Sequence, residues 1–202
     1  MVIKKRNLGQ VKLVQLQPHG LIIKTPSGYL YEATRRLEVE ELIISERGIE
    51  ATTPTGKHIL DIHHLNHPEK AYDKDDLISI GFTSHYQAMR EQFGKHMEDG
   101  VAGENIIIEN KQEIWLEDLG SQIFIENSKT GHLTILDQIQ IANPCEEFSH
   151  FAASNQDERL SADKLKATLQ FLSNGRRGFL MLLSAGQEPA IIRRGDLVYT
   201  VN

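Results

Sequence analysis

Hydrophobic and polar residues alternate through the first part of the chain, which is the pattern of a β-strand with one buried face. The segment VKLVQLQ (residues 11–17) alternates in this way and predicts the first strand. Two more strands are predicted at LIIK (21–24) and EVEELIIS (38–45). The turn residue Gly20 precedes the first of them, and Gly48 follows the second.

Short runs of Ile, Leu and Val continue this pattern in the second half of the chain. They predict strands at residues 105–109, 122–126, 132–142, 178–184, 190–193 and 196–201. Gly131, Gly186 and Gly195 stand where the chain should reverse. Because many short strands occur without regular alternation with helices, we expect a mostly-β fold, a single antiparallel β-barrel over residues 1–202 with a few short helices.

Two segments have helical spacing. Tyr86, Met89 and Phe93 lie on one face of a helix predicted over 83–93, which Thr83 or Ser84 would cap and Gly94 would end. A second apolar stripe predicts a helix over 161–173, capped by Ser161 and ended near Gly175. Both stripes indicate packing against the core.

Residues 53–76 predict a long polar loop, and loops of this length are often functional. The loop holds four histidines, His58, His63, His64 and His67, and four aspartates, Asp61, Asp73, Asp75 and Asp76. Zinc binding by this set is an open alternative, although structural zinc sites have tighter ligand spacing and usually include cysteine. We expect the loop to border the cavity that contains the cysteine.

Composition limits the partners and the compartment. The chain has 202 residues and a net charge of −6, which disfavours nucleic acid as a partner but leaves room for a local anion pocket. One cysteine cannot form an internal disulfide, and no apolar run has the length of a signal peptide core or a membrane span. We therefore expect a cytoplasmic protein that does not enter a membrane.

Cys145, in the segment IANPCEEFSHFA (141–152), is the only cysteine. A lone cysteine is most often a buried, inert side chain, but a thiolate can also bind a soft metal or carry a persulfide. Pro144 fits a junction between a strand and a helix, where Cys145 would begin a turn. Glu146 and Glu147 would oppose the lowered pKa that a thiolate needs, and a Cys145–His150 pair has no identifiable third residue to orient it.

Three segments together resemble the MOSC domain, the module found at the C-terminus of molybdenum cofactor sulfurases and in small stand-alone bacterial proteins. They are VAGENIIIE (101–109), NPCEEFSHF (143–151) and NGRRGFLMLLSAGQEPAIIRRGDLVYTV (174–201). The resemblance covers residues 60–201. The large pyridoxal-phosphate domain of the sulfurases has no counterpart in a chain of this length.

The resemblance implies that the molybdenum cofactor, molybdopterin, binds here. Cys145 would be the catalytic thiolate and molybdenum ligand. Asn105 would bond a pterin edge, Arg176 or Arg177 would bind the cofactor phosphate because a guanidinium suits that group, and His67 would match a histidine of the family's loop. We expect Cys145 to face a pocket that is lined by one of these arginines and by Asn105.

The leading functional interpretation is therefore an oxidoreductase that reduces N-hydroxylated small molecules and takes electrons from a separate partner protein, since no flavin, haem or iron–sulfur motif is visible. The alternative is a sulfur-carrier or cofactor-binding module, in which Cys145 holds a persulfide or the cofactor and a sulfur-donor protein is the partner. A structural barrel that has lost its site is a third possibility.

Overall fold

Seven strands close into a β-barrel in the part of the chain that the computed structural model describes, residues 5–26, 28–53, 55–70, 78–154 and 159–201. The barrel strands are β1 (Lys5–Leu16), β8 (Ile78–Phe82), β9 (Ile106–Glu109), β10 (Ile123–Glu126), β11 (Leu133–Ile141), β12 (Phe179–Leu183) and β14 (Leu197–Val201). The mostly-β prediction is confirmed.

The order of strands around the barrel is β14-β10-β11-β12-β8-β9-β1, and β1 then pairs with β14 to complete the ring. A short strand, β4 (Leu37–Val39), extends the sheet beyond the other end of β1. Every pair is antiparallel except β8 and β9, which run parallel. The barrel is therefore mostly antiparallel, and β8 and β9 run parallel because a helix separates them in sequence and returns the chain to the same end.

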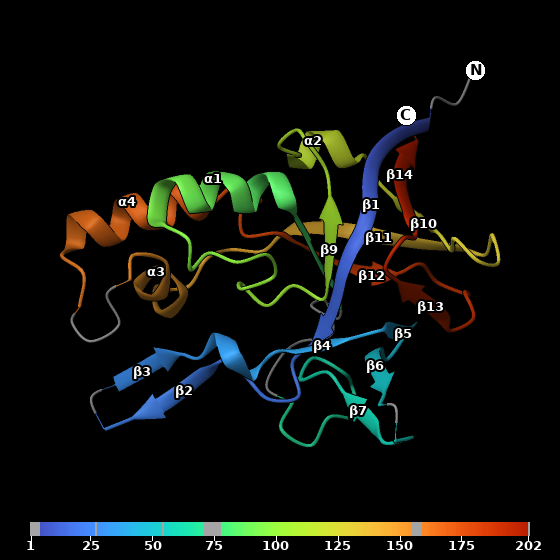
Figure 1. Cartoon of the computed structure of the whole chain (residues 1–202), viewed down its shortest axis with the longest axis horizontal. Helices are drawn as coiled ribbons and strands as arrows, with labels where there is room; N and C mark the ends of the chain where they lie inside the picture. The colour runs from blue at the N-terminus through green and yellow to red at the C-terminus, as the bar shows by residue number, and fades with distance from the viewer. Residues whose placement is uncertain (1–4, 27, 54, 71–77, 155–158, 202) are drawn as a thin grey trace.

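Two smaller sheets lie outside the barrel (Figure 1). A four-stranded sheet in the order β13-β5-β6-β7 combines β5 (Glu41–Ser45), β6 (Gly48–Thr52), β7 (His58–Leu60) and β13 (Ala190–Arg193). A hairpin of β2 (Ile22–Thr25) and β3 (Gly28–Tyr31) projects from the barrel and is followed by a 3-10 helix, η1 (Ala33–Arg35). The predicted strand 38–45 is thus two strands, and the predicted loop 53–76 includes β7.

Helices cover one side of the barrel (Figure 1). They are α1 (Thr83–Phe93), α2 (Leu116–Leu119), α3 (Glu146–Ala152) and α4 (Ala162–Leu172). The two predicted helices, 83–93 and 161–173, are confirmed as α1 and α4. No described helix is long and apolar enough to cross a membrane.

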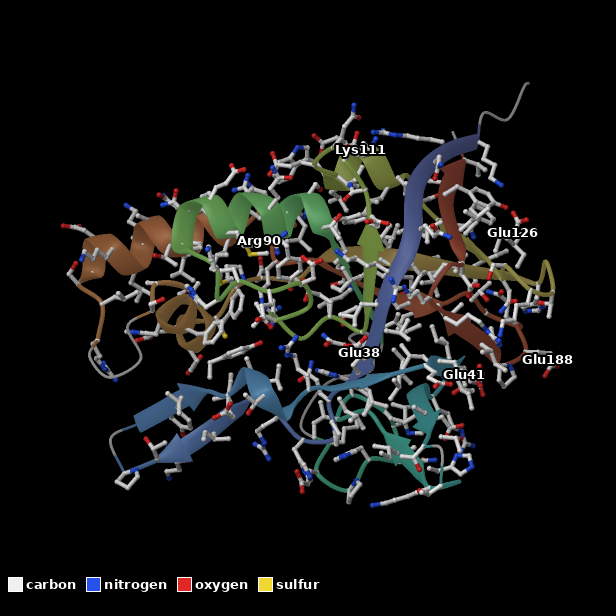
Figure 2. The ribbon with its side chains drawn as sticks, in the orientation of Figure 1. Glu38, Glu41, Arg90, Lys111, Glu126 and Glu188 are labelled. Carbon is white, nitrogen blue, oxygen red and sulfur yellow. The ribbon has the colours of Figure 1, made fainter. Side chains whose placement is uncertain are left out.

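Two apolar cores result from this arrangement, and side chains fill both (Figure 2). One lies within the barrel and includes Ile80, Phe82 and Ile108, and the other lies between the barrel wall, α1, α3, α4 and the β2–β3 hairpin. The second core includes Tyr86 and Phe148, and Cys145 packs at its edge. The cysteine therefore lies where helices meet the barrel.

The helix starts differ in their capping. Ser161 caps α4 as predicted, since its Oγ accepts the Lys164 N–H at 3.4 Å. The predicted cap of α1 by Thr83 or Ser84 is wrong, because both residues already lie within the helix. The cap comes instead from Asn110, whose Oδ1 accepts the Ser84 N–H at 3.1 Å. A residue from the next strand–loop segment thus supplies the acceptor that the helix needs.

Candidate functional site

A pocket of about 250 Å³ opens at one end of the barrel, where several connections between strands converge. We call it the Cys145 pocket. Its lining residues come from the ends of β1, β8, β9, β11 and β12, from the β2–β3 hairpin and from the segment after β7: Gln17, Leu21, Ile22, Tyr31, His63, Ser79, Ala102, Gly103, Glu104, Ala142, Asn143, Cys145, Arg177 and Leu180.

Cys145 lies on the wall of this pocket at the start of α3. Its Sγ accepts a hydrogen bond from the Phe148 N–H at 3.4 Å, so the side chain caps the helix, as Pro144 before it suggests. Burial raises the pKa of the Cys145 thiol, and the Phe148 N–H and Arg177 offset part of this rise. Glu147 raises the pKa further. The unliganded side chain is therefore a thiol.

Arg177 faces the same pocket from the turn before β12. Its Nη2 donates to the Ala102 carbonyl at 3.5 Å, and its guanidinium carbon lies 5.7 Å from the centre of the Phe148 ring. The Nε–H is buried and has no hydrogen-bond partner among the described residues. Buried N–H groups are normally paired, so this donor is available to a ligand in the pocket.

The neighbouring arginine points elsewhere. Arg176 forms an ion pair with Glu113 at 3.0 Å, donates to the Phe171 carbonyl at 2.6 Å and stacks over the Phe171 ring at 4.3 Å. It does not line the Cys145 pocket. Of the two arginines that the sequence offered, the structure brings only Arg177 to the cysteine.

Asn105 lies behind the pocket wall and is not in the lining. Its Oδ1 accepts from the N–H and hydroxyl of Ser79, while its Nδ2 donates to Asp61 Oδ2 at 2.9 Å and to the Gln15 carbonyl at 3.3 Å. The side chain is 1% exposed, and its donors and acceptor are already used. Asn105 thus supports Asp61, and the structure does not bring it to the pocket as the sequence predicted.

His63 and Asp61, which the sequence offered only as members of an open zinc set, form a pair. Asp61 is fully buried, and its Oδ1 accepts from both the backbone N–H and the ring Nδ1 of His63, the latter at 2.7 Å. Its Oδ2 accepts from the Gln17 N–H and from Asn105. Four donors around one carboxylate fix the orientation of His63, which lines the Cys145 pocket.

His67, the histidine favoured by the sequence, lies outside the pocket lining. Its Nε2 is 3.1 Å from the Pro18 carbonyl and its Nδ1 accepts the Glu69 N–H, so it closes a local turn. The Asp61-x-His63 spacing, which lets one carboxylate bond both the N–H and the ring, was the available signal for His63. The predicted loop does border the pocket, through His63.

Other metal arrangements have less support. The described residues contain no group of three or more His, Cys, Asp or Glu side chains that could hold a metal ion. Asp73, Asp75 and Asp76 of the predicted loop lie outside the described residues. His150 lies 3.5 Å from Glu146 across one turn of α3, and it does not line the Cys145 pocket.

Glu104 is an acidic residue in the pocket lining. It is 3% exposed, and its Oε2 accepts from the Tyr86 hydroxyl at 2.6 Å. Its Oε1 is buried without a hydrogen-bond partner among the described residues. Burial raises the pKa of the Glu104 carboxyl, and this effect outweighs the hydrogen bond from Tyr86 and the charge of Arg177, which lower it.

Solved structures share this fold at low sequence identity. The YuaD protein from Bacillus subtilis superposes with a TM-score of 0.60 and 11% identity, and the match covers 100% of this chain and 99% of that one. YiiM from Geobacillus stearothermophilus superposes with a TM-score of 0.52 and 15% identity, covering 95% and 74%. At such identities the likeness establishes the fold only. No curated protein sequence matches the chain.

A family model described as MOSC domain matches residues 67–199, which is more than half of the chain. The matched segment includes Glu104, Cys145 and Arg177, three of the residues that line the pocket. His63 lies just before the matched segment, and the hairpin residues lie further toward the N-terminus. The chain therefore belongs to the MOSC domain family, which is associated with binding of the molybdenum cofactor.

Proposed function

We propose that the Cys145 pocket binds the molybdenum cofactor and that the protein is an oxidoreductase acting on N-hydroxylated small molecules. The observation that carries this proposal is the meeting of Cys145 and Arg177 on the walls of one pocket. A cysteine sulfur is a soft ligand suited to a thiophilic metal, and a guanidinium suits a phosphate group. The molybdenum cofactor presents both a thiophilic metal and a phosphate.

The residues present fit such a group. Arg177 has a buried Nε–H without a partner among the described residues, which is the donor that an anionic ligand would satisfy. The pocket volume of about 250 Å³ lies just below the range of roughly 300–1,000 Å³ for ligand sites. Exposed Ile22 and Asn143 in the lining leave the pocket open to solvent, so a larger ligand can extend outward.

When bound, the cofactor would supply the two-electron redox chemistry. Cys145 would lose its thiol proton and bind the metal through Sγ. Because its pKa is raised in the unliganded protein, metal binding must release a proton near neutral pH. Arg177 compensates the negative charge that then forms on sulfur and on the ligand.

His63 would supply acid–base chemistry at the pocket wall. Reducing an N–OH group to N–H and water consumes two electrons and two protons. Asp61 Oδ1 accepts from the Nδ1–H of His63, with 2.7 Å between Nδ1 and Oδ1, and this bond orients the ring at the pocket wall. The electrons would come from a separate partner protein.

Replacement of Cys145 by Ser tests the role of the sulfur as metal ligand. We expect Cys145→Ser to fold with nearly unchanged thermal stability, since the hydroxyl can also cap α3, but to lose bound molybdenum, because oxygen is a poorer ligand for a soft metal. Molybdenum and pterin should be quantified in protein purified from a host that makes the cofactor. Equal molybdenum content in the variant and the native protein would contradict the proposal.

The two adjacent arginines provide a matched pair for the anion site. We expect Arg177→Ala to weaken cofactor retention by roughly 2–5 kcal/mol, the cost of removing one partner of a buried charge pair. Arg176→Ala removes the same charge outside the pocket and should leave retention unchanged at comparable stability. Bound pterin, measured by the fluorescence of its oxidised form, reports both. Equal losses in the two variants would argue against a specific role for Arg177.

The sulfur-carrier alternative makes a different prediction from the same preparations. A carrier would hold a persulfide on Cys145 that cyanide releases as thiocyanate, and it would not reduce a hydroxylamine with an artificial electron donor. Both roles need the Cys145 thiolate, which the raised pKa disfavours, so the two assays distinguish them. Reduction of the hydroxylamine by the loaded native protein, lost in Cys145→Ser, is the expected result.

A further inference from the structure

We propose that Glu104 is a neutral carboxylic acid whose Oε1–H, together with Arg177, donates to an oxyanion in the Cys145 pocket, so that ionisation of Glu104 weakens oxyanion binding. The identity of the natural oxyanion, the cofactor phosphate, rests on the proposed function. The role of Glu104 rests on the geometry of this chain.

The hydrogen bonds around Tyr86 determine where a proton on Glu104 must lie. The Ala102 N–H donates to the Tyr86 hydroxyl oxygen at 3.1 Å. The hydroxyl hydrogen of Tyr86 therefore points away from Ala102, and its acceptor is Glu104 Oε2 at 2.6 Å. The better acceptor of this bond is a carbonyl oxygen at Oε2, and we therefore assign the proton of the neutral carboxyl to Oε1.

The surroundings of Oε1 show that its position is built into the fold. A Cβ atom at Gly81 would lie 2.6 Å from Oε1, and one at Gly178 would lie 3.1 Å from it. These glycines belong to β8 and to the turn before β12, so two separate elements leave room for this oxygen. Oε1 nevertheless has no partner among the described residues, although Glu104 lines the pocket.

A cationic side chain of the same pocket lining also has a buried polar group without a partner among the described residues. This group is the Nε–H of Arg177. If Glu104 were ionised, it would cancel the charge of Arg177 and repel an anion. With Glu104 neutral, the pocket offers two donors and a net positive charge, which is the combination that an oxyanion requires.

The charged and titratable groups around Glu104 come from several elements. Tyr86 of α1 bonds Oε2, Arg177 precedes β12, Arg36 follows η1 and Tyr31 belongs to β3. The burial of Glu104 raises its pKa against the opposing influence of both arginines. The raised pKa agrees with the geometry, because a proton on Oε1 does not require a hydrogen bond to either arginine.

Sulfate is the probe for the test, because its charge does not change between about pH 5 and pH 8, where a shifted carboxyl can titrate. Binding is measured by calorimetry on the full chain purified without cofactor. We expect sulfate affinity to fall as pH rises, by up to tenfold per pH unit if one proton is linked to binding. Glu104→Gln keeps a donor and cannot ionise, so its affinity should stay near the acidic value of the native protein at every pH.

Two matched variants make the result specific. Glu147→Gln removes a carboxylate beside Cys145 and should retain the native pH dependence. Arg177→Ala should bind more weakly at every pH and keep the slope. Infrared difference spectra of native protein against Glu104→Gln should show a carboxylic-acid band that disappears as pH rises.

The inference is overturned if Glu104→Gln keeps the native pH dependence, if Glu147→Gln abolishes it, or if the carboxylic-acid band is absent at every pH. It is independent of metal content. Loss of the proposed function would appear as a failure to retain molybdenum while the sulfate results stand. Failure of the inference would appear as an unchanged slope in Glu104→Gln while molybdenum is still retained.

Discussion

The carboxyl of Glu104 loses nearly all of its contact with water when the chain folds, since only 3% of the residue stays exposed. Its folded pKa lies above the ordinary value of 4.5. Below that value both the folded and the unfolded chain carry the proton. As pH rises above it, the unfolded chain ionises first, so the free energy of unfolding falls until the folded pKa is passed.

Glu104→Gln cannot ionise. We therefore expect the free energy of unfolding of the variant minus that of the native protein to increase as pH rises from 4.5. The total increase should be about 1.4 kcal/mol for each unit by which folding raises the pKa of Glu104. Urea unfolding at several pH values measures this difference. Glu188→Gln, at an exposed position labelled in Figure 2, is the control and should parallel the native protein. A constant difference between Glu104→Gln and the native protein would contradict the expectation.

At the scale of elements, the start of α1 shows why local sequence predicts a helix better than its cap. The stripe of Tyr86, Met89 and Phe93 places the helix correctly, because the 3.6-residue period is a property of the segment itself. The cap depends on Asn110, which only the parallel pairing of β8 and β9 brings near Ser84. A residue brought close by tertiary structure therefore provides the helix cap that the sequence predicted at Thr83 or Ser84.

Removal of this remote cap should weaken the fold. We expect Asn110→Ala to lower the free energy of unfolding by about 0.5–2 kcal/mol, the range for loss of an N-cap side chain. The hydrogen bond that the Thr83 hydroxyl donates to the backbone carbonyl of residue 110, at 3.0 Å, should persist in the variant. Denaturant unfolding gives the measurement, and Asn66→Ala, at an exposed position, serves as the control. A change no larger than that of the control would show that another group caps α1.

For the whole molecule, the sequence predicted the strands that are continuous apolar runs, such as 122–126 and 190–193, because the runs themselves carry the signal. It could not predict β7, because the three residues HIL are too few to show an alternating pattern. The resemblance brought Cys145 and Arg177 forward as candidates, and the fold places both in one pocket.

His63 and Glu104 were missed for a physical reason. The importance of each depends on partners distant in sequence or on space left by other elements. His63 is oriented by a carboxylate that Asn105 supports, and Glu104 occupies room that Gly81 and Gly178 provide. Neither relation is visible in a linear pattern of polar and apolar residues, because both arise only when the barrel forms.

The seam between β1 and β14 has a consequence for biosynthesis. Lys5 pairs with Val201 and Gln10 with Leu197, so the ring joins residues made early to residues made late. During translation β1 must wait for β14 to leave the ribosome, and one of its edges stays unpaired meanwhile. Unpaired edges attract other strands, and such distant contacts form slowly. We therefore expect the nascent chain to depend on chaperones until its last strand is released.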